Sequence, residues 1–265
     1  MREITSLQEL KQIELEIMKC IHDFCIKNEI EYNLAFGSLI GAVRHNGFIP
    51  WDDDIDICML RSDYQRFRKE FPTYAKNHGL YVAANDTSPL YLRAMAKVCD
   101  ERTLLVEPGY QFSEPIGVFV DVFPVDGTPD NKILRYLHIK RIRLLTLCFF
   151  AGLKKDEYFT EKRISKKVLR TISKIIGLKR IEKMIEASSS KYKAKPTGYV
   201  IASAAWLRSY RFSDLRPVHL AKFEDAEFFI PDNYDSMLRK AYGDYMKLPP
   251  EEQRIPHHVM NTYWK

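Results

Sequence analysis

The chain has 265 residues, enough to bury a full core in one elaborated domain or in two small ones. Apolar residues make up 46% and charged residues 29% of it, which is typical of a soluble globular protein. The first residues lack the apolar run of a signal peptide, and the longest apolar stretch, Leu144 to Leu153, is too short to span a bilayer. Five cysteines, without a C-x-x-C pair, fit reduced thiols in a cytoplasmic protein.

The net charge of +6 conceals an asymmetry along the chain. Residues 132–195 contain nineteen Lys and Arg but only five Asp and Glu, a net +14, which leaves −8 for the rest. Two interpretations remain open: this stretch contacts an anionic membrane surface or a polyanionic acceptor, or its helices only expose a solvated basic face. No recognisable base-stacking motif accompanies the charge, so no nucleic-acid partner is expected.

Helices and short strands alternate in the first half of the predicted fold. The spacing of apolar residues predicts a helix over 6–28, a strand over 32–36, a short helix over 37–43, an acidic strand from residue 54, a helix over 62–74, and strands over 80–84, 92–99 and 103–106. The last two are expected to pair. A run rich in Val and Phe from Gly117 predicts a central strand that ends at Pro124, with Asp126-Gly127 as an ordinary turn.

The second half begins with helices. The pattern predicts helices over 130–152, 160–176 and 178–190, then a strand over 199–203, a hairpin over 218–228, a helix over 232–242 and a polar tail. The predicted fold class is therefore α/β (α+β), with a mixed sheet flanked by helices, a basic helical insert and a C-terminal hairpin and helix. The division that we predict is a catalytic core over 1–130, the insert over 131–196 and a C-terminal segment over 197–265 that returns to the core.

Four carboxylates fall within five residues from Asp52 to Asp56. Asp54 and Asp56 alternate with Ile55 and Ile57, which predicts a strand with both carboxylates on one face and the isoleucines in the core. Two carboxylates this close repel unless a cation lies between them or one is protonated, and such oxygen ligands suit Mg²⁺. The pattern indicates a metal-dependent phosphate site. A shift of one residue would make Asp52 and Asp54 the pair instead; otherwise Asp52 and Asp53 are expected to be solvated or to support the ligands.

Residues before the acidic strand can bind a phosphate group. Gly37 and Ser38 begin a short helix whose N-terminal N–H groups can receive one, and Arg44 suits bidentate phosphate binding. Trp51 either walls the site or fills the core.

Two further positions stand out later in the chain. Asp121 interrupts the apolar central strand, where a charge is costly without a partner, and is a functional candidate for that reason. The adjacent His257 and His258 do not face one another as metal ligands on a helix would, so a contact with phosphate or acceptor is expected.

Several stretches of the sequence resemble the LicD family of phosphocholine transferases, which belongs to the wider nucleotidyltransferase fold. The matching stretches are Gly37-Ser-Leu-Ile-Gly-Ala-Val-Arg-His-Asn-Gly-Phe-Ile-Pro-Trp-Asp-Asp-Asp-Ile-Asp, Arg61-x-Asp63-Tyr64, Lys97-Val98 with Asp100, Val120-Asp-Val-Phe-Pro-Val-Asp-Gly127, Tyr242-Gly-Asp and Leu248-Pro-Pro-Glu-Glu252. They extend over most of the chain, and the first is long and specific. The helical stretch over 130–195 matches no fixed pattern.

The resemblance implies a nucleotidyltransferase-like core and a set of roles. Asp54 and Asp56 would hold Mg²⁺, or Mn²⁺ in its place, with Asp121 as the third carboxylate. The donor would be a CDP-linked alcohol, most often CDP-choline, and the acceptor a sugar hydroxyl on a surface glycan or its lipid-linked precursor, with CMP leaving. Charged groups near the donor phosphates would neutralise them. These groups are Arg44, His45 and Lys97.

The expected mechanism is in-line phosphoryl transfer in the cytoplasm or at the inner face of the membrane. Asp121 would also accept the proton of the sugar hydroxyl. An aromatic cage suits a quaternary ammonium group, and Trp51, Trp206 and Tyr210 are candidates by residue type alone.

Two alternatives to phosphocholine transfer remain at this point. The same fold could transfer a nucleoside monophosphate and release pyrophosphate. A calcium loop would place Asp52, Asp54, Asp56 and Asp63 at positions 1, 3, 5 and 12, but Ile57 stands where that loop needs Gly.

Overall fold

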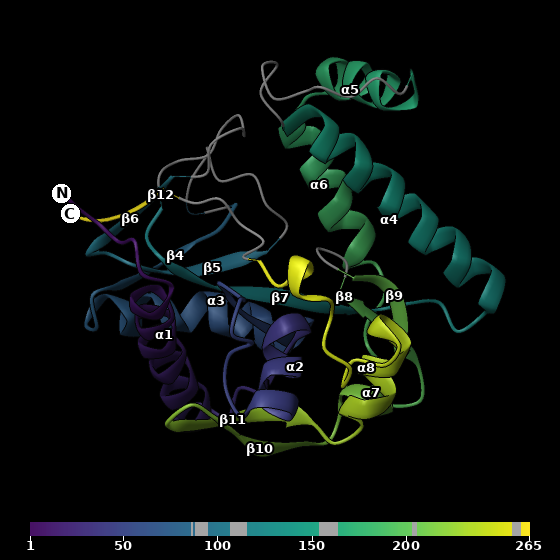
Figure 1. The fold of residues 1–265 in the computed structure, drawn as a ribbon. Helices are drawn as coiled ribbons and strands as arrows, with labels where there is room; N and C mark the ends of the chain where they lie inside the picture. Colours follow the sequence, from purple (N-terminus) through teal and green to yellow (C-terminus); the bar gives the residue numbers. More distant parts are fainter. Residues whose placement is uncertain (86, 88–94, 107–115, 154–163, 203–205, 256–260) are drawn as a thin grey trace.

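The protein is described here by a computed structural model of residues 1–265, which describes all of them except 86, 88–94, 107–115, 154–163, 203–205 and 256–260 (Figure 1). The described helices are α1 (Leu7–Lys27), α2 (Phe36–His45), α3 (Arg61–Lys76), α4 (Lys132–Leu153), α5 (Ile164–Ile176), α6 (Leu178–Ser189), α7 (Phe212–Leu215), α8 (Tyr234–Tyr242) and the 3-10 helix η2 (Glu251–Gln253). The described strands are β1 (Arg2–Glu3), β2 (Asn33–Leu34), β3 (Ile55–Leu60), β4 (Leu80–Ala83), β5 (Ala96–Asp100), β6 (Thr103–Val106), β7 (Phe119–Gly127), β8 (Tyr199–Ala202), β9 (Trp206–Arg211), β10 (Val218–Phe223), β11 (Ala226–Pro231) and β12 (Asn261–Trp264).

A mixed sheet runs through the middle of the molecule, with its strands in the order β2-β3-β7-β5-β4. β3 and β7 are parallel, and the other neighbours in that order are antiparallel. β8 pairs with the end of β7, and β9 pairs with β8. All nine residues of β7 are buried, so this strand is the central one that its Val and Phe content predicted. The predicted fold class, a mixed sheet flanked by helices, is confirmed.

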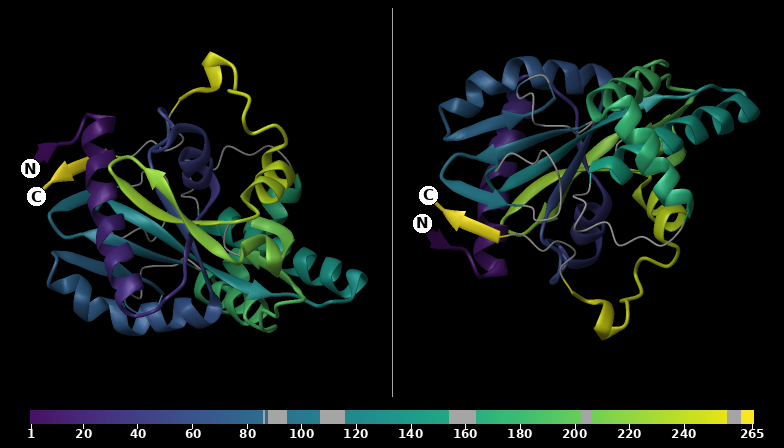
Figure 2. Two further views of the ribbon diagram at one scale, coloured as in Figure 1. Left: turned by 90° about the horizontal axis from the view of Figure 1, so that it is seen from below. Right: turned by 90° about the horizontal axis from the view of Figure 1, so that it is seen from above.

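The two faces of β3 and β7 differ in what they carry. On one face Ile55, Ile57, Val120 and Val122 are fully buried in the main core, to which α1 and α3 contribute their apolar sides. Figure 2 shows both helices lying against this sheet. The intervening residues point to the opposite face, where the acidic side chains lie. The period-2 pattern of isoleucines therefore sets which face the carboxylates occupy.

The end of β7 differs from the prediction at two points. Pro124 does not end the strand: the described part of β5 pairs with β7 as far as Val122, and β8 pairs with it from Asp126, so Pro124 falls between these neighbours. A missing N–H is tolerated in such a gap. Asp126 and Gly127 are likewise not an ordinary turn. They belong to the strand, and Asp126 is buried.

Helices α4, α5 and α6 occupy the stretch predicted as the basic insert and pack around a small apolar cluster of their own. This cluster consists of Cys148, Phe149, Leu153, Ile181 and Ile185. Arg61 at the start of α3 connects the helices to the sheet. Its guanidinium donates two hydrogen bonds of 2.7 Å to the carboxylate of Asp126 and one of 2.6 Å to Glu186 of α6. Among the described residues, no helix has both the length and the apolar content needed to cross a membrane.

The C-terminal segment contains the predicted hairpin, formed by β10 and β11, and the predicted helix α8. Its end was not predicted. β12 lies between β1 and β6 in a three-stranded sheet, which brings the two chain termini together. The predicted pairing of residues 103–106 with the strand before them is wrong, because β6 takes β12 as its partner instead.

Candidate active site

Three of the predicted site residues come together where β3 and β7 run side by side. Asp56 and Asp121 are direct partners in the parallel register of the two strands, and Asp54 stands just before β3. Partners in register share one face of the sheet, so both carboxylates project from the side opposite the core. Asp56 is 8% exposed and Asp121 is 7% exposed. The sheet thus brings together residues that are 65 positions apart in the sequence.

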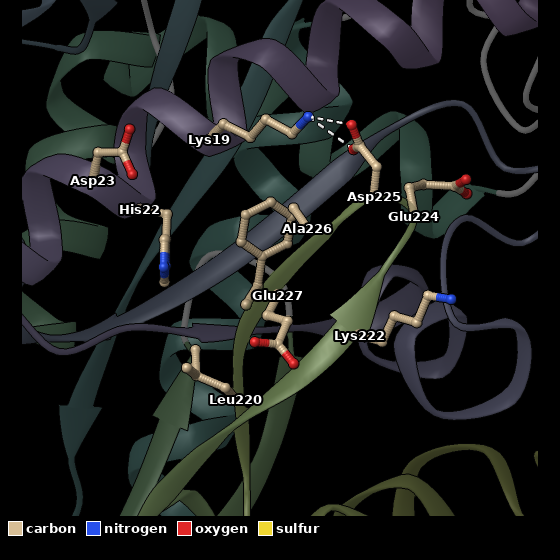
Figure 3. Close-up of a pocket in the computed structure, with 10 residues that line it drawn as sticks. Lys19, His22, Asp23, Leu220, Lys222, Glu224, Asp225, Ala226 and Glu227 are labelled. Atoms are coloured by element: carbon tan, nitrogen blue, oxygen red, sulfur yellow. Dashed lines mark hydrogen bonds and ion pairs between the residues drawn. The ribbon is translucent and has the colours of Figure 1, made fainter.

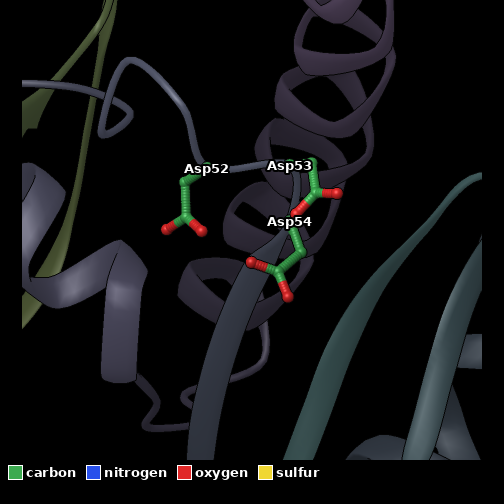
Figure 4. A group of neighbouring side chains, drawn as sticks. All are labelled: Asp52, Asp53 and Asp54. Atoms are coloured by element: carbon green, nitrogen blue, oxygen red, sulfur yellow. The ribbon is translucent and has the colours of Figure 1, made fainter. Parts of the chain in front are cut away.

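Asp52 and Asp53 join this group. The carboxylate oxygens of Asp52, Asp53 and Asp54 lie within 4.8 Å of one another at the start of β3, near α1 and α2 (Figure 4). Asp52 and Asp53 are buried, so the prediction that they are solvated is wrong, and a role in supporting the ligands stays a prediction. The calcium-loop alternative is also wrong, because β3 is an extended strand through the middle of the proposed loop.

The crowding of negative charge changes the protonation of the group. The pKa of Asp56 is raised well above its usual value, first because the side chain is buried and then because Asp54, Asp121 and Asp52 repel its charged form; Lys97 acts in the opposite direction. Bringing a divalent cation among these oxygens would relieve the repulsion. All of the ligand atoms on offer are carboxylate oxygens, the donor type that Mg²⁺ and Mn²⁺ prefer. The residues present therefore fit such an ion; among the described residues, the ligand atoms that lie within 4.8 Å of one another are those of Asp52, Asp53 and Asp54, not those of the predicted set Asp54, Asp56 and Asp121.

A further carboxylate, which sequence analysis missed, belongs to this region. Glu14 on α1 is 3% exposed, and its Oε2 atom has no hydrogen-bond partner among the described residues. Its pKa is raised well above the usual value, first by burial and then by the charges of Asp54, Asp53 and Asp52. The sequence did contain a signal for this residue. Glu14 stands four residues after Leu10 and three before Ile17, so its charge lies inside the apolar stripe of the first helix.

Two lysines lie in the same region. The Nζ atom of Lys97 lies 2.6 Å from Oδ1 of Asp121 and 3.1 Å from the centre of the Phe119 ring, and its side chain is 2% exposed. The structure therefore places Lys97 as the counter-ion of Asp121; its predicted contact with donor phosphate stays a prediction. Lys11 of α1 donates hydrogen bonds of 2.9 Å to the carbonyl oxygens of Ile49 and Pro50, and so holds the loop that leads to the aspartates.

Gly37 and Ser38 form the first turn of α2, next to the aspartates. The Oγ atom of Ser38 accepts a 2.9 Å hydrogen bond from the backbone N–H of Asp56, which fixes the helix against β3. A Cβ atom on Gly37 would lie 2.3 Å from Oδ2 of Asp52, so a larger residue here would force the Asp52 carboxylate to move. The start of α2 therefore lies against the carboxylates, as a helix N-terminus that receives a metal-bound phosphate would.

Arg44 and His45 lie at the other end of α2. The Nε atom of Arg44 donates a 2.9 Å hydrogen bond to His45, and its Nη1 donates to the carbonyl oxygen of Tyr245. Burial, followed by the charges of Arg44 and Lys11, lowers the pKa of His45, so the imidazole is neutral at pH 7. Through Tyr245, the C-terminal part of the chain therefore holds this pair of predicted phosphate ligands.

The three predicted contact residues have different outcomes. Trp51 is partly buried against the main core, with its ring edge-to-face with His45 and the guanidinium of Arg254 5.6 Å from the ring centre. Trp51 therefore packs against the core, and the prediction that it walls the site stays a prediction. His257 and His258 fall outside the residues that the structure describes, and so does the side chain of Trp206.

Tyr242 at the end of α8 is another residue that sequence analysis did not assign to the site. Its pKa is raised, first by the burial of part of its side chain, which is still 45% exposed, and then by the charges of Asp56, Tyr210 and Asp52 in turn. These interactions place a tyrosine from the C-terminal segment close to the carboxylates of the sheet. Asp56 and Tyr242 are far apart in sequence, and no local pattern connects them.

A concave region lies between α1 and the hairpin of β10 and β11 (Figure 3). It is a groove of about 710 Å³ in which Lys19 of α1 pairs with Asp225 of the hairpin at 2.7 Å. The lining contains both signs of charge, and none of the residues predicted for phosphate or metal binding belongs to it. The groove is therefore separate from the predicted phosphate and metal residues.

Comparison with known proteins places this chain in a family. The family profile described as "LicD/FKTN/FKRP, nucleotidyltransferase domain" matches residues 29–140. The lipopolysaccharide cholinephosphotransferase LicD of Haemophilus influenzae is 34% identical over 268 residues, which cover 99% of each chain. The chain belongs to the LicD family. The resemblance inferred from its motifs is thereby confirmed.

Two shorter matches are to uncharacterized proteins. An uncharacterized protein of Rickettsia typhi is 31% identical over 129 residues, or 48% of this chain, and one of Rickettsia prowazekii is 41% identical over 59 residues. The LicD-family profile spans β2, α2, β3 and β7, so all of the predicted carboxylates lie within the matched residues. Helices α5 and α6 and the C-terminal segment lie outside it.

Proposed function

We propose that this protein transfers phosphocholine, or a related phospho-alcohol, from a CDP-linked donor to a hydroxyl group of a cell-surface glycan or its lipid-linked precursor, with release of CMP. The observation that carries the proposal is the register of β3 and β7, which brings Asp56 and Asp121 side by side with Asp54 next to them. The near full-length match to a protein named as a lipopolysaccharide cholinephosphotransferase supports the class of reaction and of acceptor.

In this proposal the aspartates hold a divalent ion. Asp54, Asp56 and Asp121 would bind Mg²⁺, which when bound supplies charge neutralisation for the diphosphate of the donor and for departing CMP. Because the site is buried on its core side by the isoleucines of β3, the ligands are held on a rigid element.

The remaining steps belong to this chain's own residues. The N–H groups at Gly37 and Ser38 would bind phosphate oxygens at the start of α2, and Arg44 and His45 would add donors from its end. Asp121 would accept the proton of the attacking sugar hydroxyl, and Lys97, at 2.6 Å, would hold that carboxylate in place. Phosphoryl transfer depends mainly on such positioning and on charge, so these groups suffice for an in-line displacement.

We place the reaction in the cytoplasm, peripherally at the inner face of the membrane. The basic charge of residues 132–195 and the lipid-linked acceptor support this location.

The decisive experiment is a donor assay with the purified protein. CDP-choline labelled in the choline phosphate is supplied with Mg²⁺ and lipopolysaccharide, and CMP and labelled glycan are measured. The proposal expects both products from the wild type and neither from Asp56→Asn. Release of pyrophosphate from CTP in place of CMP from CDP-choline would instead establish nucleotidyl transfer. Asp225→Asn is the matched control, because Asp225 is exposed on the hairpin and, among the described residues, its ion pair is with Lys19.

A further inference from the structure

Helix α5 carries its apolar side chains on the outside. Ile164 and Ile175 are each 80% exposed, Val168 is 50% exposed and Ile172 is 37% exposed. With about 100° of rotation per residue, the four positions fall within an arc of about 80° on the helix surface. We call these four residues the α5 stripe. A surface helix of a soluble protein normally directs such a stripe into the core, so this orientation needs an explanation.

The opposite side of α5 shows that its orientation is fixed by packing. Arg170 is 6% exposed, and its Nη1 donates a 2.9 Å hydrogen bond to the carbonyl oxygen of Ala151 on α4. Ser173 is 1% exposed and lies so close to α4 that a Cβ on Gly152 would come within 2.0 Å of its Oγ. Leu169 and Ile176 pack on the apolar cluster of the insert. The helix thus buries two polar side chains while most of its apolar surface stays outside.

Helix α4 repeats this arrangement. Four of its exposed apolar residues recur at the spacing of one helix face: Ile133 (70%), Leu137 (56%), Leu144 (55%) and Leu147 (48%); Leu134 (56%) and Phe150 (42%) lie to either side of that face. Tyr136 next to them is 59% exposed, as suits a side chain at the boundary of apolar and polar surroundings. Two neighbouring helices of the insert therefore present large apolar side chains outward. Scattered exposed apolar residues are common, but stripes on adjacent helices mark a contact surface.

The charge of the insert indicates what that surface contacts. Lys167 and Lys174 are exposed on α5 and lie about 60° to 80° to one side of its stripe, and Lys140 lies within the stripe of α4. The whole stretch of residues 132–195 has a net charge of +14. A second copy of the chain would bring another surface of the same charge against it, which is unfavourable. An anionic lipid surface offers both the apolar layer and the opposite charge.

We propose that the α5 stripe, with the exposed apolar face of α4, inserts into the interfacial layer of an anionic bilayer while the flanking lysines contact lipid phosphates. The partner is therefore a lipid surface, and the insert is the element that binds it. Figure 1 shows α5 at the outer end of the insert, on the opposite side of the molecule from β10 and β11, so the hairpin stays clear of the bilayer. This binding requires neither donor nor acceptor and stands independently of the proposed reaction.

Vesicle flotation without any nucleotide tests the proposal. The full chain is mixed with vesicles of phosphatidylcholine alone, or with about a third phosphatidylglycerol, at about 0.1 M salt. The wild type is expected to float with the anionic vesicles at least tenfold more strongly than with the neutral ones. Ile164→Ser combined with Ile175→Ser should weaken binding to the anionic vesicles at least tenfold. Lys167→Gln combined with Lys174→Gln should weaken it by roughly fivefold per lysine.

The control removes exposed apolar residues elsewhere. Ile26→Ser with Leu220→Ser changes side chains that are 51% and 44% exposed on α1 and β10, and it should float like the wild type. Circular dichroism confirms that each variant is folded. The proposal is overturned if the α5 variant floats like the wild type, if the control loses binding equally, or if neutral vesicles bind as well as anionic ones. It is also overturned if sedimentation velocity shows a wild-type dimer that the α5 variant dissociates, since the stripe would then be a subunit contact.

Discussion

The start of β3 and the outer side of the insert violate the usual distribution of side chains in opposite ways. At the start of β3 carboxylates are buried next to one another; on α5 isoleucines are exposed to water. The first region belongs to the part of the chain with net charge −8 and the second to the part with +14. Neither arrangement stabilises the isolated protein, and we propose that each binds something: a cation with phosphate in one case, a lipid surface in the other.

The comparison also shows how the two regions are connected. Arg61 joins them, since its guanidinium holds Asp126 at the end of the central strand and Glu186 on α6. This contact consists of ion pairs, and the side chain of Asp126 in it is completely buried. A rigid connection of this kind would fix the orientation of the insert, and with it the lipid-facing side, relative to the carboxylates.

The largest effect is expected at the carboxylates. Asp56→Asn and Asp121→Asn should each lower CMP release by about a thousandfold or more, because each removes a charge that holds the metal or the proton. In metal-free buffer the melting temperature of Asp56→Asn should be a few degrees higher than that of the wild type, because the substitution removes charge repulsion from a buried group. For a protein of this size, each kcal/mol gained corresponds to roughly 2–4 °C. Activity and melting temperature are measured on the same preparations. A variant that loses activity and stability together would speak for a structural role.

The next effect concerns Arg61, whose ion pairs connect the insert to the sheet. Arg61→Gln should lower the free energy of unfolding by about 3–5 kcal/mol, because it leaves the buried carboxylate of Asp126 without its partner. Urea titration measures the loss. Arg239→Gln is the control, since the ion pair of Arg239 with Asp235 is exposed, and its urea midpoint should not move. A small loss for Arg61→Gln would mean that the insert is held by other contacts.

A smaller effect is expected in the pH dependence of stability. The folded-state pKa values of Asp56 and Glu14 are raised, so these groups bind protons more tightly in the folded than in the unfolded chain. Their contribution to stability is therefore present at low pH and is lost as pH rises through the raised pKa values. With EDTA present, the free energy of unfolding of Glu14→Gln should fall less between pH 5 and 8 than that of the wild type. The difference should be about 1.4 kcal/mol for each pH unit by which folding raises the pKa of Glu14. Parallel curves would contradict the assignment of Glu14 to the acidic group.

The smallest effect is the one on the stability of the insert. Ile164→Ser and Ile175→Ser should each leave the free energy of unfolding within about 0.5 kcal/mol of the wild type, because both side chains are exposed in the free protein. Ile181→Ala, in the cluster beneath them, should cost about 2–5 kcal/mol. Urea titration compares the three. Comparable losses for all of them would show that the stripe packs against protein.

Local patterns were sufficient to predict the central features of the site. The alternation of Ile55 and Ile57 with the aspartates set the phase of β3, and a lone charge in an apolar run singled out Asp121. The helices of the insert followed from their period of 3.6 residues. In each case the determining information lies within about ten residues of sequence.

What sequence analysis missed depends on contacts between distant segments. Asp126 was assigned to a turn because its partner Arg61 is 65 residues away, and Glu14 was missed because only the packing of α1 brings it to the aspartates. The pairing of β12 with β1 likewise joins the two ends of the chain, which are far apart in sequence. The outward orientation of α5 could not be predicted either, since amphipathicity alone does not say which face is covered.

The most direct test of the central claim is an anomalous difference map from a crystal grown with Mn²⁺ and CDP-choline. We expect a peak within bonding distance of carboxylate oxygens of Asp54, Asp56 and Asp121, with donor phosphate on its far side. A peak held by Asp52 and Asp53 without Asp121, or no peak at the start of β3, would contradict the account.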